Sequence, residues 1–172
     1  MSGWHIRLAR PDDAEAYSEV EEDAAGLLRE DPSLVGIPVP PTEDAAHYRS
    51  LIRRGHCLTA YEGERVIGFA AAAPLRRELH LAELSVARSH QRIGVGATLL
   101  EALAIDGRNS GMRAITLNTY IDIPWNAPFY ARHGFVELQD FEGRPHLAQS
   151  LEKAVALGLP RERRCAMIRF LT

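Results

Sequence analysis

Apolar residues along this chain follow two periods, one of two residues and one close to 3.6, which indicate β-strands and α-helices respectively. Trp4, Ile6 and Leu8 alternate with polar neighbours, as in a half-buried strand, whereas Val95 and Leu99 begin a helical repeat. The same pattern predicts strands at residues 4–8, 56–61, 65–73, 78–86, 114–119, 135–141 and 165–171, and helices at 12–29, 42–53, 95–107, 124–132 and 146–157.

The segment 31–41 cannot continue the helix that precedes it, because it holds four prolines and one glycine and proline breaks a helix interior. We expect an extended loop there, of the kind that often covers a binding site. Thr42 is predicted to cap the helix that follows. The acidic run 19–23 in the preceding helix predicts a solvent-exposed face without chemistry.

Within the strand at 78–86, the apolar positions change parity. The two leucines before Ala82 hold odd positions, whereas the apolar residues after Glu83 hold even ones. Strand side chains alternate with a period of two, so a change of parity requires one inserted residue. The sequence therefore predicts a β-bulge at Ala82 and Glu83, a feature that often lies beside functional sites.

The strand at 78–86, the helix from Val95 and the strand at 114–119 form a β-α-β unit. Such a unit makes a right-handed crossover between two parallel strands. The helix N-terminus then lies at the carboxyl edge of the strands, where ligands collect.

Composition narrows the class of protein. With 172 residues, 46% of them apolar, the chain is predicted to form one domain over 1–172. A formal charge of −3 and a pI near 6.2 disfavour nucleic-acid binding, which needs a basic footprint. No segment approaches the roughly 20 apolar residues of a membrane span, and the first ten residues do not resemble a signal peptide. We expect a cytoplasmic protein without a membrane partner.

Cysteine and histidine give no sign of a metal or disulfide framework. Cys57 and Cys165 are the only cysteines, without Cys-x-x-Cys spacing, and we expect both to be buried as small apolar groups. His56 and His80, on predicted strands, are candidates for lining a substrate pocket. His90 is a candidate phosphate contact, although an exposed turn residue is the simpler interpretation.

The turn between the strand at 78–86 and the helix from Val95 has the chemistry of an anion cradle. Gly94 and Gly96 let the backbone approach an anion closely, the helix N-terminus adds partial positive charge, and Arg92 adds a full one. The alternative is that the glycines serve turn geometry alone. A P-loop is excluded because no Gly-Lys-Ser/Thr follows, and Leu99 stands where a dinucleotide fingerprint has its third glycine.

Two motifs carry a resemblance that covers nearly the whole chain. The run Gln91-Arg92-x-Gly94-x-Gly96-Ala97 resembles the acetyl-CoA pyrophosphate loop of the GCN5-related N-acetyltransferases, the GNAT family, and residues 129–135 resemble its second signature. The resemblance implies an α+β (mixed α/β) fold. Its central sheet would hold about seven mostly antiparallel strands and splay between strands 4 and 5, at 78–86 and 114–119, with flanking helices.

The resemblance also implies where acetyl-CoA binds. The pantetheine arm would pair with backbone groups of the bulged strand, and the pyrophosphate would meet amides of the glycine turn. Relatives often carry an Asn about seven residues before the tyrosine of the second signature, but Ile123 stands there, so Asn126 is the candidate in its place. The predicted cofactor contacts are thus Leu84, Ser85, Val86, Gln91, Arg92, Ile93, Gly94, Val95, Gly96, Ala97 and Asn126.

Two residues are candidates for the chemistry. An amine attacks a thioester only when uncharged, so a proton acceptor is needed. Glu83 lies on a strand rich in leucine, where an apolar setting raises a carboxyl pKa; the alternative is that it faces solvent or pairs with an arginine. Tyr130 matches the family's general acid for the departing thiolate, and its alternative is a core aromatic with a hydrogen-bonded hydroxyl.

The predicted function is transfer of an acetyl group from acetyl-CoA to a primary amine of a small molecule, by direct attack in a ternary complex. A backbone amide near Val86 would hold the carbonyl oxygen. Two alternatives remain: acetylation of a protein N-terminus or lysine, and a non-catalytic CoA-binding regulatory domain. We expect neither a metal nor a nucleic acid as partner, and homodimers are common among relatives.

Overall fold

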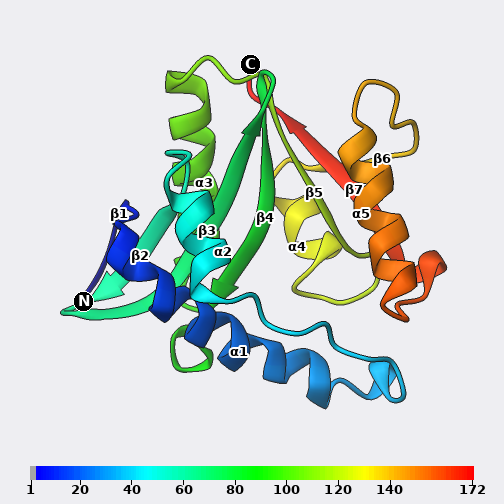
Figure 1. The fold of residues 1–172 in the computed structure, drawn as a ribbon, viewed down its shortest axis with the longest axis horizontal. Coiled ribbons are helices and arrows are strands. Elements are labelled where there is room, and N and C mark those ends of the chain that lie inside the picture. Colours follow the sequence, from blue (N-terminus) through cyan, green and yellow to red (C-terminus); the bar gives the residue numbers. More distant parts are fainter. Residues whose placement is uncertain (1–2) are drawn as a thin grey trace.

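The structure is a computed structural model that describes residues 3–172. One seven-stranded sheet, in the order β1-β2-β3-β4-β5-β7-β6, organises these residues (Figure 1). The strands are β1 (Trp4–Leu8), β2 (Leu58–Glu62), β3 (Arg65–Leu75), β4 (Glu78–Val86), β5 (Ala114–Tyr120), β6 (Val136–Leu138) and β7 (Arg164–Phe170). The helices are α1 (Ala14–Glu30), α2 (Ala45–Ile52), α3 (Val95–Asn109), α4 (Ala127–Arg132) and α5 (Pro145–Ala156).

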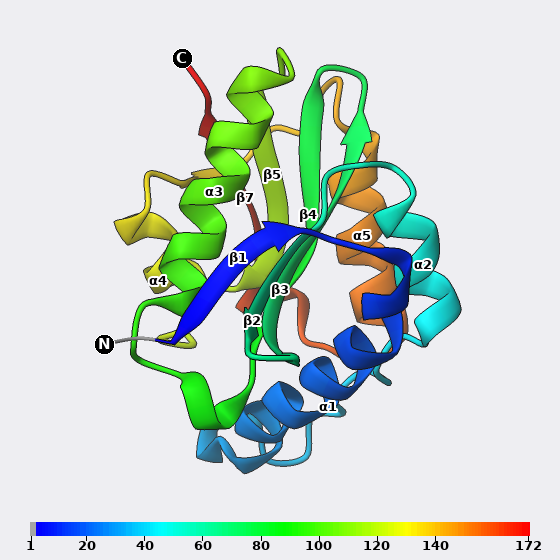
Figure 2. The ribbon, with the colours of Figure 1, turned by 90° about the vertical axis from the view of Figure 1, so that its left-hand side faces the viewer.

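All neighbouring strands pair antiparallel except β4 and β5, which run parallel. The crossover through α3 that joins them was expected from the spacing of the β-α-β unit. Helices α1, α2 and α5 cover one face of the sheet, and α3 and α4 cover the other (Figure 2). The predicted mixed sheet flanked by helices is confirmed.

Each face of the sheet has its own apolar core. On the α3 side, fully buried Leu79, Leu99 and Leu103 belong to the larger cluster. On the α1 side, Tyr17 stacks on Phe69 with ring centroids 4.1 Å apart. Aromatic stacking of this kind adds to the stabilisation from area burial and fixes α1 against β3.

Two local predictions are wrong. The cap of α2 is Asp44, whose side chain accepts a 2.8 Å hydrogen bond from the His47 N–H, whereas Thr42 bonds Glu22 on α1. Strand β6 is shorter than 135–141, because a turn closes after it: the Asp140 carboxylate accepts from the Glu142 N–H at 2.9 Å. Such Asx turns compete with strand pairing.

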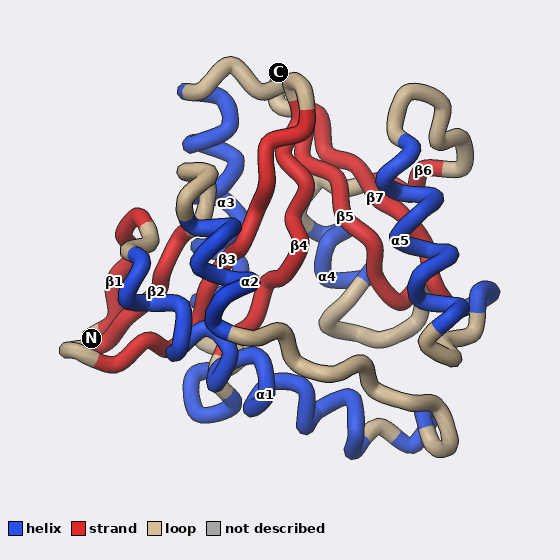
Figure 3. The backbone as a smooth tube through the Cα atoms, viewed as in Figure 1, coloured by secondary structure: helices blue, strands red, loops and turns tan. Residues whose placement is uncertain are grey.

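The predicted bulge is confirmed in β4. Ala71 of β3 pairs with Glu83 and Ala72 pairs with Leu81, which leaves Ala82 as the extra residue. Parallel pairing of β4 with β5 is confined to residues 78–80 of β4. Beyond this point the two strands separate, as the tube in Figure 3 shows, so the splay expected between strands 4 and 5 is present.

Candidate active site

The end of β4 presents backbone to the region where β5 has turned away. Leu84, Ser85 and Val86 pair on one side with residues 68–70 of β3, but their other side has no strand partner in the described chain. The Gln91 side chain donates a 3.0 Å hydrogen bond to the Val86 carbonyl and fixes the strand end to the loop that follows. Because the other side of this segment has no strand partner, an extended ligand can pair with β4 there as an added strand does.

The loop after β4 leaves a series of amides without acceptors. Arg92 (φ 62°) and Gly94 (φ 93°) both adopt left-handed backbone, and within residues 3–172 no backbone carbonyl accepts from the N–H groups of Arg92, Ile93 or Gly94. The first N–H groups of α3 are also free of intrahelical partners. Successive free amides at a helix N-terminus bind phosphate.

The two sequence motifs meet in space at this loop. A Cβ built on Gly96, in the first turn of α3, would lie 3.8 Å from the Phe129 ring of α4. Val95 is buried, so its backbone rather than its side chain is available to a ligand. Arg92 and Ile93 are exposed, with their side chains at the surface of the loop.

Glu83 follows the bulge and lies beside the free part of β4. Its Oε1 accepts a 2.7 Å hydrogen bond from the Ser85 hydroxyl. Burial of the carboxyl, reinforced by the nearby negative charge of Glu21, raises the pKa of Glu83 to about 8. A carboxylate with such a pKa is suited to accept a proton near neutral pH.

Tyr130 lies on α4 and is 9% exposed. Its ring packs edge-on against Phe129 and Phe135, and no hydrogen bond within residues 3–172 involves its hydroxyl. Burial and then the charge of Glu83 raise the pKa of Tyr130. Tyr130 thus lies within reach of the charge of Glu83, the other predicted catalytic residue.

A family model described as the acetyltransferase (GNAT) family matches residues 16–135. The chain belongs to the GNAT acetyltransferase family. It is accordingly an N-acyltransferase that uses acetyl-CoA as acyl donor.

Solved structures with the same fold are distant in sequence. The PaiA N-acetyltransferase of Thermoplasma acidophilum, in complex with coenzyme A, is 17% identical with a TM-score of 0.68 and covers 99% of each chain. The Escherichia coli ribosomal-protein-S18-alanine N-acetyltransferase is 16% identical with a TM-score of 0.70, over 98% of this chain and 94% of that one. An N-acetylglutamate synthase of Neisseria gonorrhoeae, complexed with coenzyme A and N-acetyl-glutamate, is 16% identical with a TM-score of 0.69, over 100% of this chain and 36% of that one.

The residues of this GNAT chain fit acetyl-CoA at the predicted place. The free side of β4 offers donors and acceptors to an amide-containing arm, and the amides of the glycine turn suit a pyrophosphate. Asn126 is less available than expected, because its Oδ1 accepts from the Thr119 hydroxyl at 2.7 Å and from the Tyr120 N–H at 3.4 Å. This side chain ties the end of β5 to the start of α4, and its contact with the cofactor stays a prediction.

The sequence did not assign three residues near Glu83 to a site, namely Glu21, Tyr48 and Arg164. The arginine run that includes Arg161, Arg163 and Arg164 predicts a solvated surface stretch, which is wrong for Arg164, because it is half-buried and its Nε is fully buried. Glu21 on α1 accepts a hydrogen bond from the Tyr48 hydroxyl on α2, and Arg164 begins β7 with its guanidinium over a tyrosine ring. The prediction that the acidic run 19–23 is wholly exposed is wrong for Glu21, whose pKa is raised by burial. No local pattern identifies these residues, because they meet only through the packing of α1, α2, β4 and β7.

The histidines do not gather at this site as one group. His56 pairs with Asp106 of α3 at 2.7 Å, and His90 faces Glu62 and Ser89 rather than the free amides. His80 bonds Thr116 at 3.1 Å, and burial lowers its pKa to about 4.

In the part of the chain that the structure describes, no cluster of three or more His, Cys, Asp or Glu side chains is arranged to hold a metal ion. No helix among residues 3–172 combines the length and apolarity needed to cross a bilayer.

Proposed function

We propose that this chain acetylates a primary amine of a small molecule by direct attack on acetyl-CoA in a ternary complex. The proposal rests on two residues beside the unpaired end of β4: Glu83, with a pKa of about 8, and buried Tyr130, whose pKa is raised by burial and by the charge of Glu83. A proton acceptor and a proton donor then serve one reaction centre.

Glu83 takes the proton from the acceptor amine, whose free electron pair forms the new N–C bond. The C–S bond of the thioester breaks, and the Tyr130 hydroxyl gives its proton to the departing sulfur. Because its pKa is raised, Tyr130 holds that proton until the thiolate forms. A backbone N–H near Val86 stabilises the negative charge that develops on the carbonyl oxygen.

The loop between α1 and α2 favours a small acceptor over a protein. Its Ser33 accepts a 2.6 Å hydrogen bond at its carbonyl from Arg163, and Leu34 packs in one cluster with Tyr120 and Ala154 of α5. In Figure 3 the loop runs back to α2 in front of the separating ends of β4 and β5. A folded partner would have to displace this bridge between α1 and α5 to reach Glu83.

The names of the structural neighbours include both a ribosomal-protein N-acetyltransferase and an N-acetylglutamate synthase. At 16% identity they support only the fold, so the choice of acceptor rests on the bridging loop. Protein acetylation is the second candidate, and opening of the loop is what it requires.

A thermal-unfolding titration with acetyl-CoA, CoA and ATP tests donor binding without knowledge of the acceptor. Saturation at about 100 times Kd adds ~2.7 kcal/mol, a shift of roughly 5–10 °C for a chain of this size. Acetyl-CoA and CoA should shift the transition and ATP should not. Release of free CoA on addition of amines then separates an enzyme from a CoA-binding regulatory domain, for which binding occurs without release.

A further inference from the structure

Arg164 lies near Glu83 and has no role in the proposed chemistry. It begins β7, where it pairs in register with Tyr120 of β5. Its guanidinium carbon lies 4.8 Å from the centre of the Tyr120 ring. Stacking of this kind holds the planar guanidinium in a fixed orientation.

The charge of Arg164 is not neutralised within the described chain. Its Nε is buried and has no hydrogen-bond partner, and no ion pair among residues 3–172 includes this side chain. The contrast with its neighbour is clear, because Arg163 pairs with Asp122 at 3.1 Å. Arginines away from water are ordinarily paired or hydrogen-bonded. Arg164 is half-buried with a buried, unpartnered Nε, which beside a reaction centre indicates a missing anion.

Negative charge lies on the opposite side of the same centre. Besides burial, the carboxylate of Glu21 on α1 raises the pKa of Glu83 on β4, whereas the guanidinium of Arg164 lowers it. The carboxylate of Glu43 also raises the pKa of Glu83. The backbone N–H of Glu43 donates a 3.1 Å hydrogen bond to the Glu21 carboxylate, so the two residues lie side by side. The centre is therefore dipolar, with carboxylates on the α1, α2 and β4 side and one guanidinium on the β7 side.

We propose that Arg164 binds a carboxylate carried by the acceptor itself, an inference that rests on the proposed function. The acceptor is then an amino acid or a similar amine with its own carboxylate. Its amine lies at Glu83 and its carboxylate at the guanidinium, which matches the charges of both sides. A single planar guanidinium fits a carboxylate in a bidentate geometry.

A second unpaired group lies on the same sheet face. The Oδ1 of Asn118 on β5 is buried without a partner, while its Nδ2 donates to the Leu147 carbonyl of α5 at 3.3 Å. Because this oxygen is closed off from solvent, it adds no contact to the acceptor, and the recognition rests on the Arg164 guanidinium. A purely hydrocarbon diamine would leave the charge of Arg164 uncompensated.

The test compares amines that differ only in the carboxylate. Release of CoA from acetyl-CoA is measured with lysine against 1,5-diaminopentane, ornithine against 1,4-diaminobutane, and the L-α-amino acids against their carboxamides. For at least one pair, the carboxylate-bearing amine should have a kcat/KM at least about tenfold higher. In Arg164→Gln this preference should fall toward one, mainly through a rise in KM, and Arg164→Lys should retain part of it because charge remains without the planar fork.

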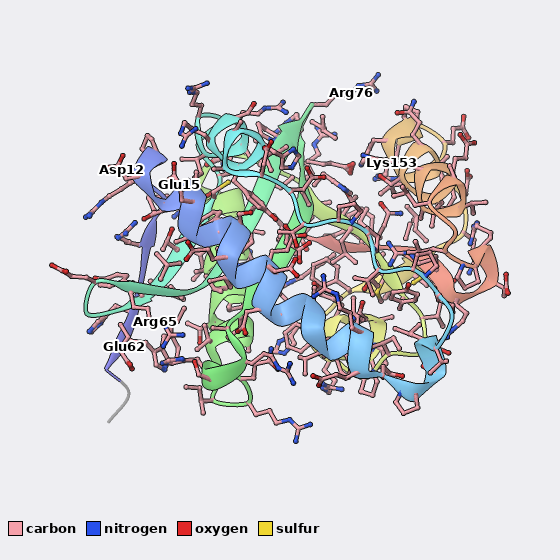
Figure 4. All side chains as sticks on the ribbon, turned by 60° about the horizontal axis from the view of Figure 1, so that its bottom comes forward. Asp12, Glu15, Glu62, Arg65, Arg76 and Lys153 are labelled. Atoms are coloured by element: carbon pink, nitrogen blue, oxygen red, sulfur yellow. The ribbon has the colours of Figure 1, made fainter. Side chains whose placement is uncertain are left out.

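Arg76→Gln is the matched control, because Arg76 is exposed at the turn between β3 and β4 (Figure 4) and its replacement removes the same charge. This variant should keep the wild-type preference. Any of three results would overturn the inference. They are equal kcat/KM for both members of every pair, an equal fall in kcat/KM for both members in Arg164→Gln, and no release of CoA with any carboxylate-bearing amine. The wild-type comparison stands even where a variant folds poorly.

Failure of the proposed function has a different signature. It is shown by the absence of a thermal shift with acetyl-CoA, or by a shift without release of CoA for any amine. Release with carboxylate-free amines alone leaves that function in place and removes only the role of Arg164.

Discussion

Replacement of Glu83 by Gln should make the protein more stable at alkaline pH than the wild type, and about equally stable at acid pH. The pKa of Glu83 is raised by burial from 4.5 to about 8, so the ionised form is disfavoured in the folded state. Its favourable contribution to folding is complete below pH ~4.5 and is lost as the pH rises to about 8. Glutamine has the same shape as the protonated acid and does not ionise.

The size of the effect follows from linkage. Each unit of pKa difference is worth about 1.4 kcal/mol, so the full shift would amount to roughly 4–5 kcal/mol. Glu83 is only half-buried by accessible surface, and water at the exposed part reduces the penalty. We therefore expect Glu83→Gln to gain about 2 kcal/mol relative to wild type between pH 5 and pH 8, or ~4–8 °C in Tm.

Thermal unfolding of both proteins, at one-unit intervals from pH 5 to pH 9 and constant ionic strength, measures this difference without a substrate. Glu64→Gln is the control for loss of one negative charge, since Glu64 is exposed at the turn between β2 and β3. A difference between Glu83→Gln and wild type that is the same at every pH would refute the raised pKa, and with it the main support for Glu83 as base.

Three further predictions concern turnover and donor binding. Tyr130→Phe should lower kcat about 100-fold while the Kd for acetyl-CoA from a thermal-shift titration stays within about twofold; equal losses in both would contradict its role as acid. Gly94→Ala forces a side chain onto a φ of 93° and should destabilise the fold by ~1–2 kcal/mol and weaken acetyl-CoA in the same titration, and unchanged binding would remove the loop from the site. Ser85→Ala removes a hydrogen bond that lowers the pKa of Glu83, so the pH at which kcat/KM levels off should move upward by about 0.5–1 unit, and a downward shift would contradict the assignment.

Local patterns were sufficient where one segment determines its own structure. The parity change around Ala82 predicted the bulge because alternation along a strand leaves no other way to bury leucines on both sides of it. Proline content predicted the irregular course of 31–41. The splay needed more than periodicity, since it came from the resemblance of two motifs. The anion cradle, in contrast, could be predicted from residue type, because Arg92 and Gly94 stand directly before a helix and Gly96 stands in its first turn.

Local patterns failed where a competing partner lies far away in the sequence. Thr42 has the chemistry of a helix cap, but Asp44 takes that position and Thr42 reaches back to Glu22 of α1. Glu21 belongs to a run that looks solvent-exposed, yet the hydroxyl of Tyr48 holds it inward. Arg164 stands among several arginines near residue 161, and nothing in that run marks the one without an acidic partner.

The bulge explains how one strand serves both halves of the site. Before Ala82, the leucines at odd positions of β4 pack into the core on the α3 side; without the extra residue, Glu83 would point into that core as well. The insertion reverses the alternation, so that Leu84 and Val86 pack against the α3 side while Glu83 and Ser85 turn toward α1 and α2. The same bend accompanies the loss of pairing with β5. A single inserted residue thus places the carboxylate on the face with Glu21 and Arg164 and leaves the adjoining backbone free for the acyl donor.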